Sequence, residues 1–155
     1  MEMMNLKKAL FLVLLLAGTL SAAEGSPAVW HTDYKKARLL AIEKKLPLMI
    51  CFSGSDWCPA SITLSRQVLR NRLFLAEAPK RYILFNADYP KHFKQGERER
   101  SRNKTLAHRY SVYTFPTVIV IQPSSERVIV RESNFPPGMS VKAFLTLFDE
   151  KMKRK

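Results

Sequence analysis

The stretch LMICFSGSDWCPAS, residues 48–61, joins an apolar run to a polar turn and then to a proline. Its first five residues, 48–52, are almost continuously apolar, which is typical of a buried central strand. Residues 53–56 (SGSD) have the composition of a turn. Pro59 suits the first turn of a helix, where its missing N–H costs nothing. The stretch therefore predicts a strand, a turn and a helix in direct succession.

Cys58 lies at the predicted start of that helix. The positive end of the helix dipole and the unpaired N–H groups of the first turn both favour a thiolate over a thiol. Pro59 is expected to hold this turn so that the sulfur stays exposed. Because the thiolate is the nucleophile in disulfide exchange, Cys58 is a candidate catalytic residue. The alternative is an inert, solvent-shielded cysteine in a scaffold without redox chemistry.

Ser61 follows three residues later, one turn along the same helix face. A cysteine there could attack a mixed disulfide between Cys58 and a partner, but a serine cannot form that bond. The hydroxyl of Ser61 can instead stabilise the Cys58 thiolate by a hydrogen bond. The C-P-A-S pattern therefore predicts a site that captures a thiol partner but does not cycle alone as a dithiol.

Helices and strands alternate along the rest of the chain, and residues 89–102 are polar, basic and without a pattern, which predicts a loop. The predicted elements are a helix over 30–45, the strand 48–52, a helix over 59–72, a strand over 82–85, a helix over 103–110, strands over 117–121 and 128–130, and a helix capped by Ser140 and ending near 151. This order predicts a parallel crossover followed by an antiparallel hairpin. The expected class is α/β, with a mixed sheet of about four strands flanked by helices.

Two segments resemble the thioredoxin superfamily: GSDWC at 54–58, after the buried strand, and YTFPT at 113–117, before the strand TVIVI. The resemblance covers about residues 30–151 and extends to the small exported bacterial members of the DsbH-like or thioredoxin disulfide isomerase group. It implies a three-layer thioredoxin-like fold with Cys58 as the attacking cysteine. It also implies a partner groove lined by Trp57, Pro59, Phe115 and Pro116, with Pro116 as a cis-proline facing the cysteine and the Phe115 backbone pairing with a substrate strand.

Two residues depart from the pattern of that superfamily. Ser61 stands in place of the resolving cysteine, and Cys51 stands where thioredoxins usually have a buried acid. On a buried strand, a cysteine is most often a small apolar core residue. The alternative is that Cys51 lies behind Ser61 and resolves the mixed disulfide of Cys58, which requires Cα atoms about 4.4–6.8 Å apart.

Residues 1–23 have the three parts of a secretory signal peptide: two lysines, an apolar run over 9–20, and small residues at 21–23. The apolar run is shorter than the roughly 20 residues of a membrane span, and an uncleaved anchor is the alternative. We therefore expect export to the periplasm, no stable membrane span after cleavage, and a mature thioredoxin-like domain over 24–155. Thiols can form disulfides in such an oxidising compartment.

The charge of the chain is strongly positive. The formal net charge is +13, and the predicted mature part, with 24 basic and 12 acidic residues, has +12. Such a charge attracts anionic partners of any kind. The basic segment 91–104 has few interleaved aromatic residues, which favours a solvated face and makes nucleic acid the least favoured partner.

Two functions stay open at this point. The first is thiol–disulfide exchange through Cys58 with protein thiols, protein disulfides or small thiols. The second is a non-catalytic thioredoxin-fold binding or chaperone module for client proteins. No Cys/His spacing suggests zinc and no phosphate-binding loop is present, so we expect neither a metal nor a cofactor.

Overall fold

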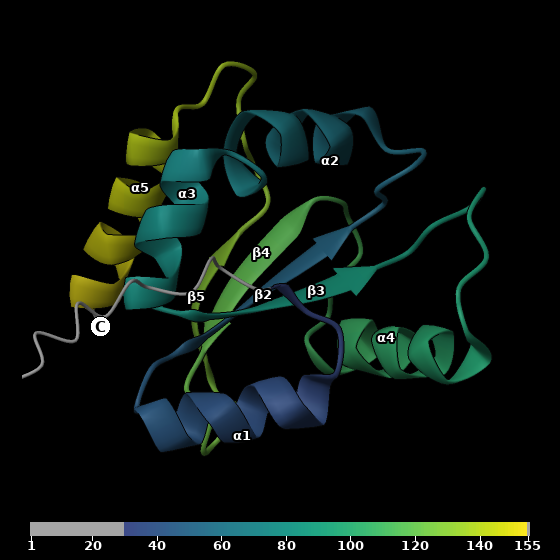
Figure 1. Ribbon diagram of the computed structural model, residues 1–155, viewed down its shortest axis with the longest axis horizontal. Coiled ribbons are helices and arrows are strands. Elements are labelled where there is room, and N and C mark those ends of the chain that lie inside the picture. Colours follow the sequence, from purple (N-terminus) through teal and green to yellow (C-terminus); the bar gives the residue numbers. More distant parts are fainter. Residues whose placement is uncertain (1–29, 155) are drawn as a thin grey trace, which may run out of the picture.

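Strand β2 (Leu48–Ser53) runs through the middle of a five-stranded sheet in the computed structural model, which describes residues 30–154 (Figure 1). All six of its residues are buried, as the apolar run predicted. Side chains alternate between the two faces of a strand, so Met49 and Cys51 enter one core while Leu48, Ile50 and Phe52 enter the other. The predicted signal peptide, residues 1–23, lies outside the described residues.

The sheet is mixed, as predicted, but it has five strands instead of four. Its order is β1-β3-β2-β4-β5; the pairs β1–β3 and β3–β2 are parallel, and the pairs β2–β4 and β4–β5 are antiparallel. The strands besides β2 are β1 (Trp30–His31), β3 (Ile83–Asp88), β4 (Thr117–Ile121) and β5 (Val128–Glu132). The additional strand, β1, has only two residues, which is too short to give a periodic signal in the sequence.

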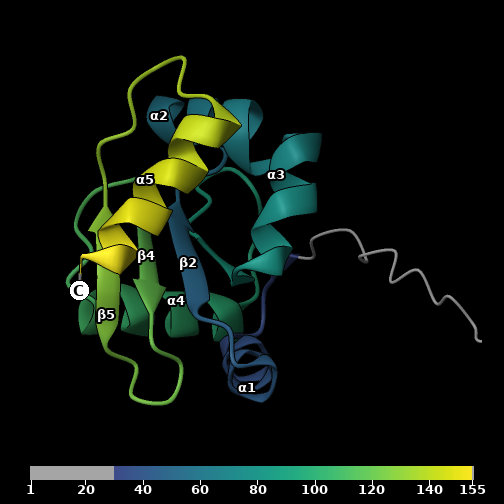
Figure 2. The same ribbon diagram turned by 90° about the vertical axis from the view of Figure 1, so that its left-hand side faces the viewer.

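Helices cover both faces of the sheet (Figures 1 and 2). One face carries α1 (Tyr34–Lys44) and α4 (Glu97–Arg109). The other carries α2 (Pro59–Leu64), α3 (Arg72–Glu77) and α5 (Val141–Lys153). This three-layer arrangement confirms the predicted fold class. None of the helices within residues 30–154 is long and apolar enough to cross a bilayer.

Two predicted helix boundaries were wrong. Residues 30–33 are not helical, because Asp33 caps α1 by accepting the Lys36 N–H at 3.1 Å. The helix predicted over 59–72 ends early: α2 continues as a π-helical turn (Ser65–Leu69), and the Asn71 side chain then caps α3 by accepting the Leu73 N–H at 2.9 Å. A new cap inside an apolar pattern starts a new helix, and periodicity alone does not show it.

The loop predicted over 89–102 is also partly wrong, because α4 begins at Glu97. Two glutamates in its first turn suit the positive end of the helix dipole. Only Asn103 and Leu106 are buried along the whole helix, so it lacks the apolar stripe by which an amphipathic helix is recognised. The basic segment is therefore largely a helix face.

Buried hydroxyl groups fix α1 and α4 to the turn that precedes β5. The Tyr34 hydroxyl lies 2.8 Å from the Tyr110 hydroxyl and donates to the Glu126 carboxylate at 2.8 Å. Arg109 makes two hydrogen bonds of 2.9 Å to the same carboxylate. Burial, followed by the hydrogen bonds with Tyr110 and Glu126, raises the pKa of Tyr34 above its usual range, so the Tyr34 hydroxyl stays protonated.

Candidate functional site

Cys58 lies where the loop after β2 turns into α2, as the sequence predicted. It is the N-cap residue of α2, with an extended backbone (φ −90°, ψ 109°), and Pro59 follows in the first turn. The Cys58 N–H donates to the Gly54 carbonyl at 2.9 Å, and the Cys58 carbonyl accepts the Ile62 N–H at 3.0 Å. These bonds fix the sulfur-bearing residue at the amino end of the helix.

A cis peptide bond joins Phe115 to Pro116, as the resemblance implied. The Cys58 thiol donates to the Phe115 carbonyl at 3.4 Å, across 57 residues of sequence. The two segments meet because β2 and β4 are antiparallel neighbours, with Phe52 paired to Thr117. The structure thus places the cysteine directly against the proline-containing loop.

Cys58 is less exposed than the sequence suggested. Only 9% of its surface is accessible and the residue is buried, so the prediction of an exposed sulfur was wrong. The hydrogen bond to the Phe115 carbonyl turns the thiol toward the neighbouring loop. A partner sulfur must therefore approach Cys58 beside that loop, where little of the residue is accessible.

Three aromatic rings from separate loops pack beside Cys58. The Trp57 ring meets the Phe115 ring edge to face at 6.0 Å between centroids, and Tyr89 stacks on Phe115 at 4.8 Å. The Trp57 Nε1 donates to the Tyr89 carbonyl at 2.7 Å. Gly54 makes room for the indole, because a Cβ there would lie 2.6 Å from Trp57 Cε2. The sequence pointed to Trp57 and Phe115, but the part of Tyr89 emerges only from the fold.

Ser61 is buried behind Cys58, with 2% of its surface exposed. Its Oγ accepts the Gly54 N–H at 3.2 Å. Among the hydrogen bonds of residues 30–154, none joins Ser61 to Cys58, although the sequence had suggested one. In this structure the hydroxyl therefore holds the loop that precedes the cysteine.

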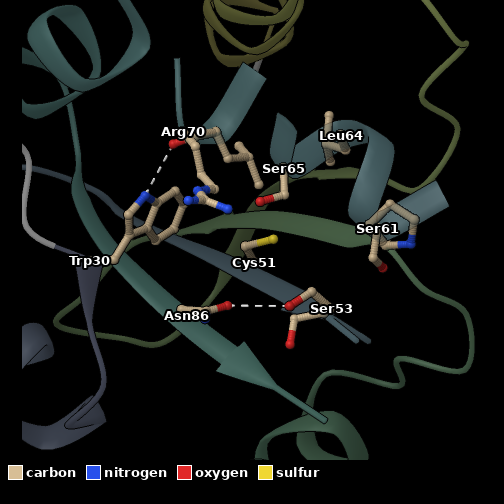
Figure 3. A pocket seen from close by; sticks show the side chains of 11 residues that line it. Trp30, Cys51, Ser53, Ser61, Leu64, Ser65, Arg70 and Asn86 are labelled. Carbon is tan, nitrogen blue, oxygen red and sulfur yellow. Dashed lines mark hydrogen bonds between the residues drawn. The ribbon is translucent and has the colours of Figure 1, made fainter. Parts of the chain in front are cut away.

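Cys51 lies in the wall of a cavity of about 190 Å³ that Ser61 and Pro116 also line. Figure 3 shows its sulfur facing the cavity, with Ser65 and Arg70 on one side and Ser53 on the other. Cys51 is 2% exposed, and both cysteines are free thiols. Burial, and then the charge of Asp88, raise the pKa of Cys51 to about 12. So little thiolate at neutral pH favours the interpretation of a core residue over a resolving thiol.

Asp56 is a site residue that the sequence analysis missed. Its carboxylate accepts three consecutive backbone N–H groups, those of Lys91, His92 and Phe93, at 2.9, 2.7 and 2.9 Å. Desolvation opposes ionisation, but these three bonds outweigh it and hold the pKa of Asp56 below its usual value. The carboxylate therefore fastens the loop after β3 to the loop that carries Cys58.

Replacing Asp56 with alanine should release that loop. We expect the amide hydrogens of residues 91–93 to exchange with solvent at least tenfold faster, because their acceptor is lost. Global stability should change little, since the carboxylate lies at the surface. A pH titration adds a second check: the depressed pKa makes this contribution complete above the unfolded value and lost as pH falls through the folded one. Unchanged exchange at 91–93 in the variant, measured by nuclear magnetic resonance, would contradict the assignment.

Within the described residues, no group of three His, Cys, Asp or Glu side chains is arranged to hold a metal ion. The site consists of one cysteine, one buried serine, an aromatic group and the cis-proline loop. A protein-family model described as thioredoxin-like matches residues 29–123, the segment that contains all of them. The chain belongs to this thioredoxin-like family.

Comparisons with individual relatives place the chain on the DsbH-like side of the thioredoxin superfamily. It is 32% identical over 130 residues to the thioredoxin-related protein DsbJ of Chlamydia pneumoniae, and 29% identical over 92 residues to the disulfide bond reductase DsbH of the same organism. The matches cover 82% and 59% of this chain but 37% and 54% of those proteins, so the chain spans about half of their length or less. The solved structure of a DsbH oxidoreductase superposes with a TM-score of 0.75 and 25% identity, covering 84% of this chain and 88% of the other.

Proposed function

We propose that this protein is exported and carries out thiol–disulfide exchange through Cys58 alone. The observation that supports the proposal most is the position of Cys58 at the N-cap of α2, with its thiol 3.4 Å from the carbonyl of the residue before the cis-proline. In disulfide exchange the thiolate is the attacking species. The relatives named above as oxidoreductase and disulfide bond reductase agree with this chemistry. Export rests on the signal-peptide pattern of residues 1–23.

The proposed reaction has two exchanges. The Cys58 thiolate attacks one sulfur of a client disulfide, the client S–S bond breaks, and the second client sulfur leaves as a thiolate. A Cys58–client disulfide remains. Ser61 cannot break it, and the raised pKa of Cys51 keeps that thiol protonated. A small thiol or a second thiol of the client must attack the mixed disulfide, and Cys58 then leaves as a thiolate.

The groove residues have separate parts in this proposal. Pro59 begins α2 and fixes the orientation of the helix end behind Cys58. Trp57 and Phe115 pack on each other beside Cys58 and form the surface along which the client segment binds. Pro116 closes the site on the side of β4, and its ring also lines the cavity behind Ser61.

The test uses a peptide whose single cysteine is joined to thionitrobenzoate, a coloured leaving group. Attack by Cys58 on the peptide sulfur releases one equivalent of the coloured thiolate and leaves the peptide on the protein. We expect the adduct to map to Cys58 by mass spectrometry, to persist in Cys51→Ala and to disappear in Cys58→Ser. An equal adduct yield in Cys58→Ser would overturn the proposal. Client binding that is unchanged in that variant would favour the non-catalytic binding module instead.

A further inference from the structure

The loop that Asp56 fastens lies on one border of the Cys58 site and presents a basic and aromatic surface. The Lys91 ammonium lies 3.7 Å from the centroid of the Trp57 ring, on the residue next to Cys58. Phe93 follows with 72% of its surface exposed, and Lys94 is exposed as well. Because three consecutive backbone groups of this loop are held by one carboxylate, the surface is fixed before any partner arrives.

A second exposed aromatic residue lies before the cis-proline. Tyr113 has 87% of its surface exposed, two residues ahead of Phe115. The stacking of Tyr89 on Phe115 connects the two loops at the same end of the sheet. Phe93 and Tyr113 are thus large aromatic side chains that contribute little to the core, on the two loops that contact the segment of Cys58. Such side chains supply rigid contact area for a partner at a small cost in conformational entropy.

The loop beside the site carries two ammonium groups, those of Lys91 and Lys94. Among residues 30–154, no carboxylate forms an ion pair with Lys91 or Lys94, and the cation–π contact leaves the Lys91 ammonium able to donate hydrogen bonds. The carboxylates of Asp56 and Asp88 keep their charge but make their hydrogen bonds elsewhere: Asp56 accepts three backbone N–H groups, and Asp88 accepts from Ser53 and Ser55.

We propose that the clients of Cys58 are segments in which acidic residues flank the reacting cysteine and an apolar side chain lies nearby. The client carboxylates bind the ammonium groups of Lys91 and Lys94, and the apolar side chain packs on Phe93 or Tyr113. This inference rests on the proposed exchange at Cys58 and names the class of client that the site selects. Charge complementarity acts chiefly on the rate of encounter, so the selection is expected in the rate of adduct formation.

The experiment compares thionitrobenzoate-linked peptides that share one aromatic residue and differ only in having aspartate, serine or lysine on both sides of the cysteine. At low salt we expect the aspartate peptide to react with the protein about tenfold faster than the serine peptide, and the lysine peptide to react more slowly than both. The preference should shrink at 0.5 M salt, where the screening length falls well below 10 Å. Phe93→Ala should slow all three peptides to a similar degree.

Two variants with the same change in charge locate the effect. Lys91→Glu/Lys94→Glu should abolish or invert the preference for aspartate. Lys44→Glu/Lys153→Glu, at exposed positions in the last turns of α1 and α5, should retain at least half of it. Equal rates for the three peptides, or an equal loss in both double variants, would overturn the client assignment. The serine peptide separates the two proposals, because its adduct at Cys58 tests the exchange chemistry whatever the flanking charge.

Discussion

Replacing Ser61 with cysteine should allow the protein to resolve its own Cys58–client disulfide and to reduce client disulfides over many turnovers. Ser61 lies one helical turn from Cys58 on the same face, and its side chain borders the cavity of about 190 Å³, which leaves space for the larger sulfur. A thiol there attacks the Cys58–client disulfide within one molecule, and such attack is favoured greatly over attack by a dilute external thiol. With a fixed supply of a small dithiol reductant, we expect multiple-turnover reduction of a disulfide peptide to rise at least tenfold. The adduct that we expect by intact mass for the wild-type protein should become scarce.

The matched control for this gain is Ser65→Cys. Ser65 lines the same cavity, so the variant adds a thiol to the same part of the core, but it lies a further turn along the helix from Cys58. This variant should retain the wild-type adduct and turnover. If Ser61→Cys left the adduct and the turnover unchanged, the residue three positions after Cys58 would not govern release of the client from the mixed disulfide. If Ser65→Cys gained as much as Ser61→Cys, the gain would come from any added thiol.

The elements that the sequence predicted well are those that neighbouring residues determine. The run 48–52 is apolar because both faces of β2 are covered, and Pro59 follows Cys58 because the first turn of a helix accepts proline. The junction that positions Cys58 was therefore predicted from adjacent residues. The cis bond at Pro116 was different, because it followed only from the resemblance to the thioredoxin superfamily and was then confirmed.

The features that the sequence did not predict depend on contacts between distant segments. Asp56 fastens residues that are 35 to 37 positions away, and no local pattern marks it as different from any other turn aspartate. The low exposure of Cys58 likewise depends on a loop 57 residues away. The first part of α4, residues 97–102, was predicted as a loop because its residues are almost all charged or polar and form no apolar stripe.

The second large effect concerns the core under α5, and Phe144→Ala is the substitution that should show it. Phe144 has no exposed surface, and its ring lies 4.8 Å from Phe148, 5.6 Å from Phe135 and 5.7 Å from Phe74. Truncating a buried phenylalanine to alanine costs about 3–5 kcal/mol of unfolding free energy through lost burial and the remaining cavity. The free energy of unfolding of a domain of this size is about 5–15 kcal/mol, so the loss is a large fraction of the total. Urea unfolding should show a much lower midpoint with an unchanged slope.

Phe93→Ala is the matched control, because the same side chain is removed from a position with 72% exposure. Its unfolding free energy should stay within about 0.5 kcal/mol of the wild type. The peptide assay should give the opposite order of effects. Phe93→Ala should slow adduct formation although the protein is stable. Phe144→Ala, assayed well below its unfolding transition, should react at nearly the wild-type rate. Helix α5 packs on β5 and on the π-helical turn that follows the carboxyl end of α2. Cys58 lies at the amino end of α2, away from these contacts. A loss below 1 kcal/mol for Phe144→Ala would show that this aromatic cluster does not anchor α5 to the sheet.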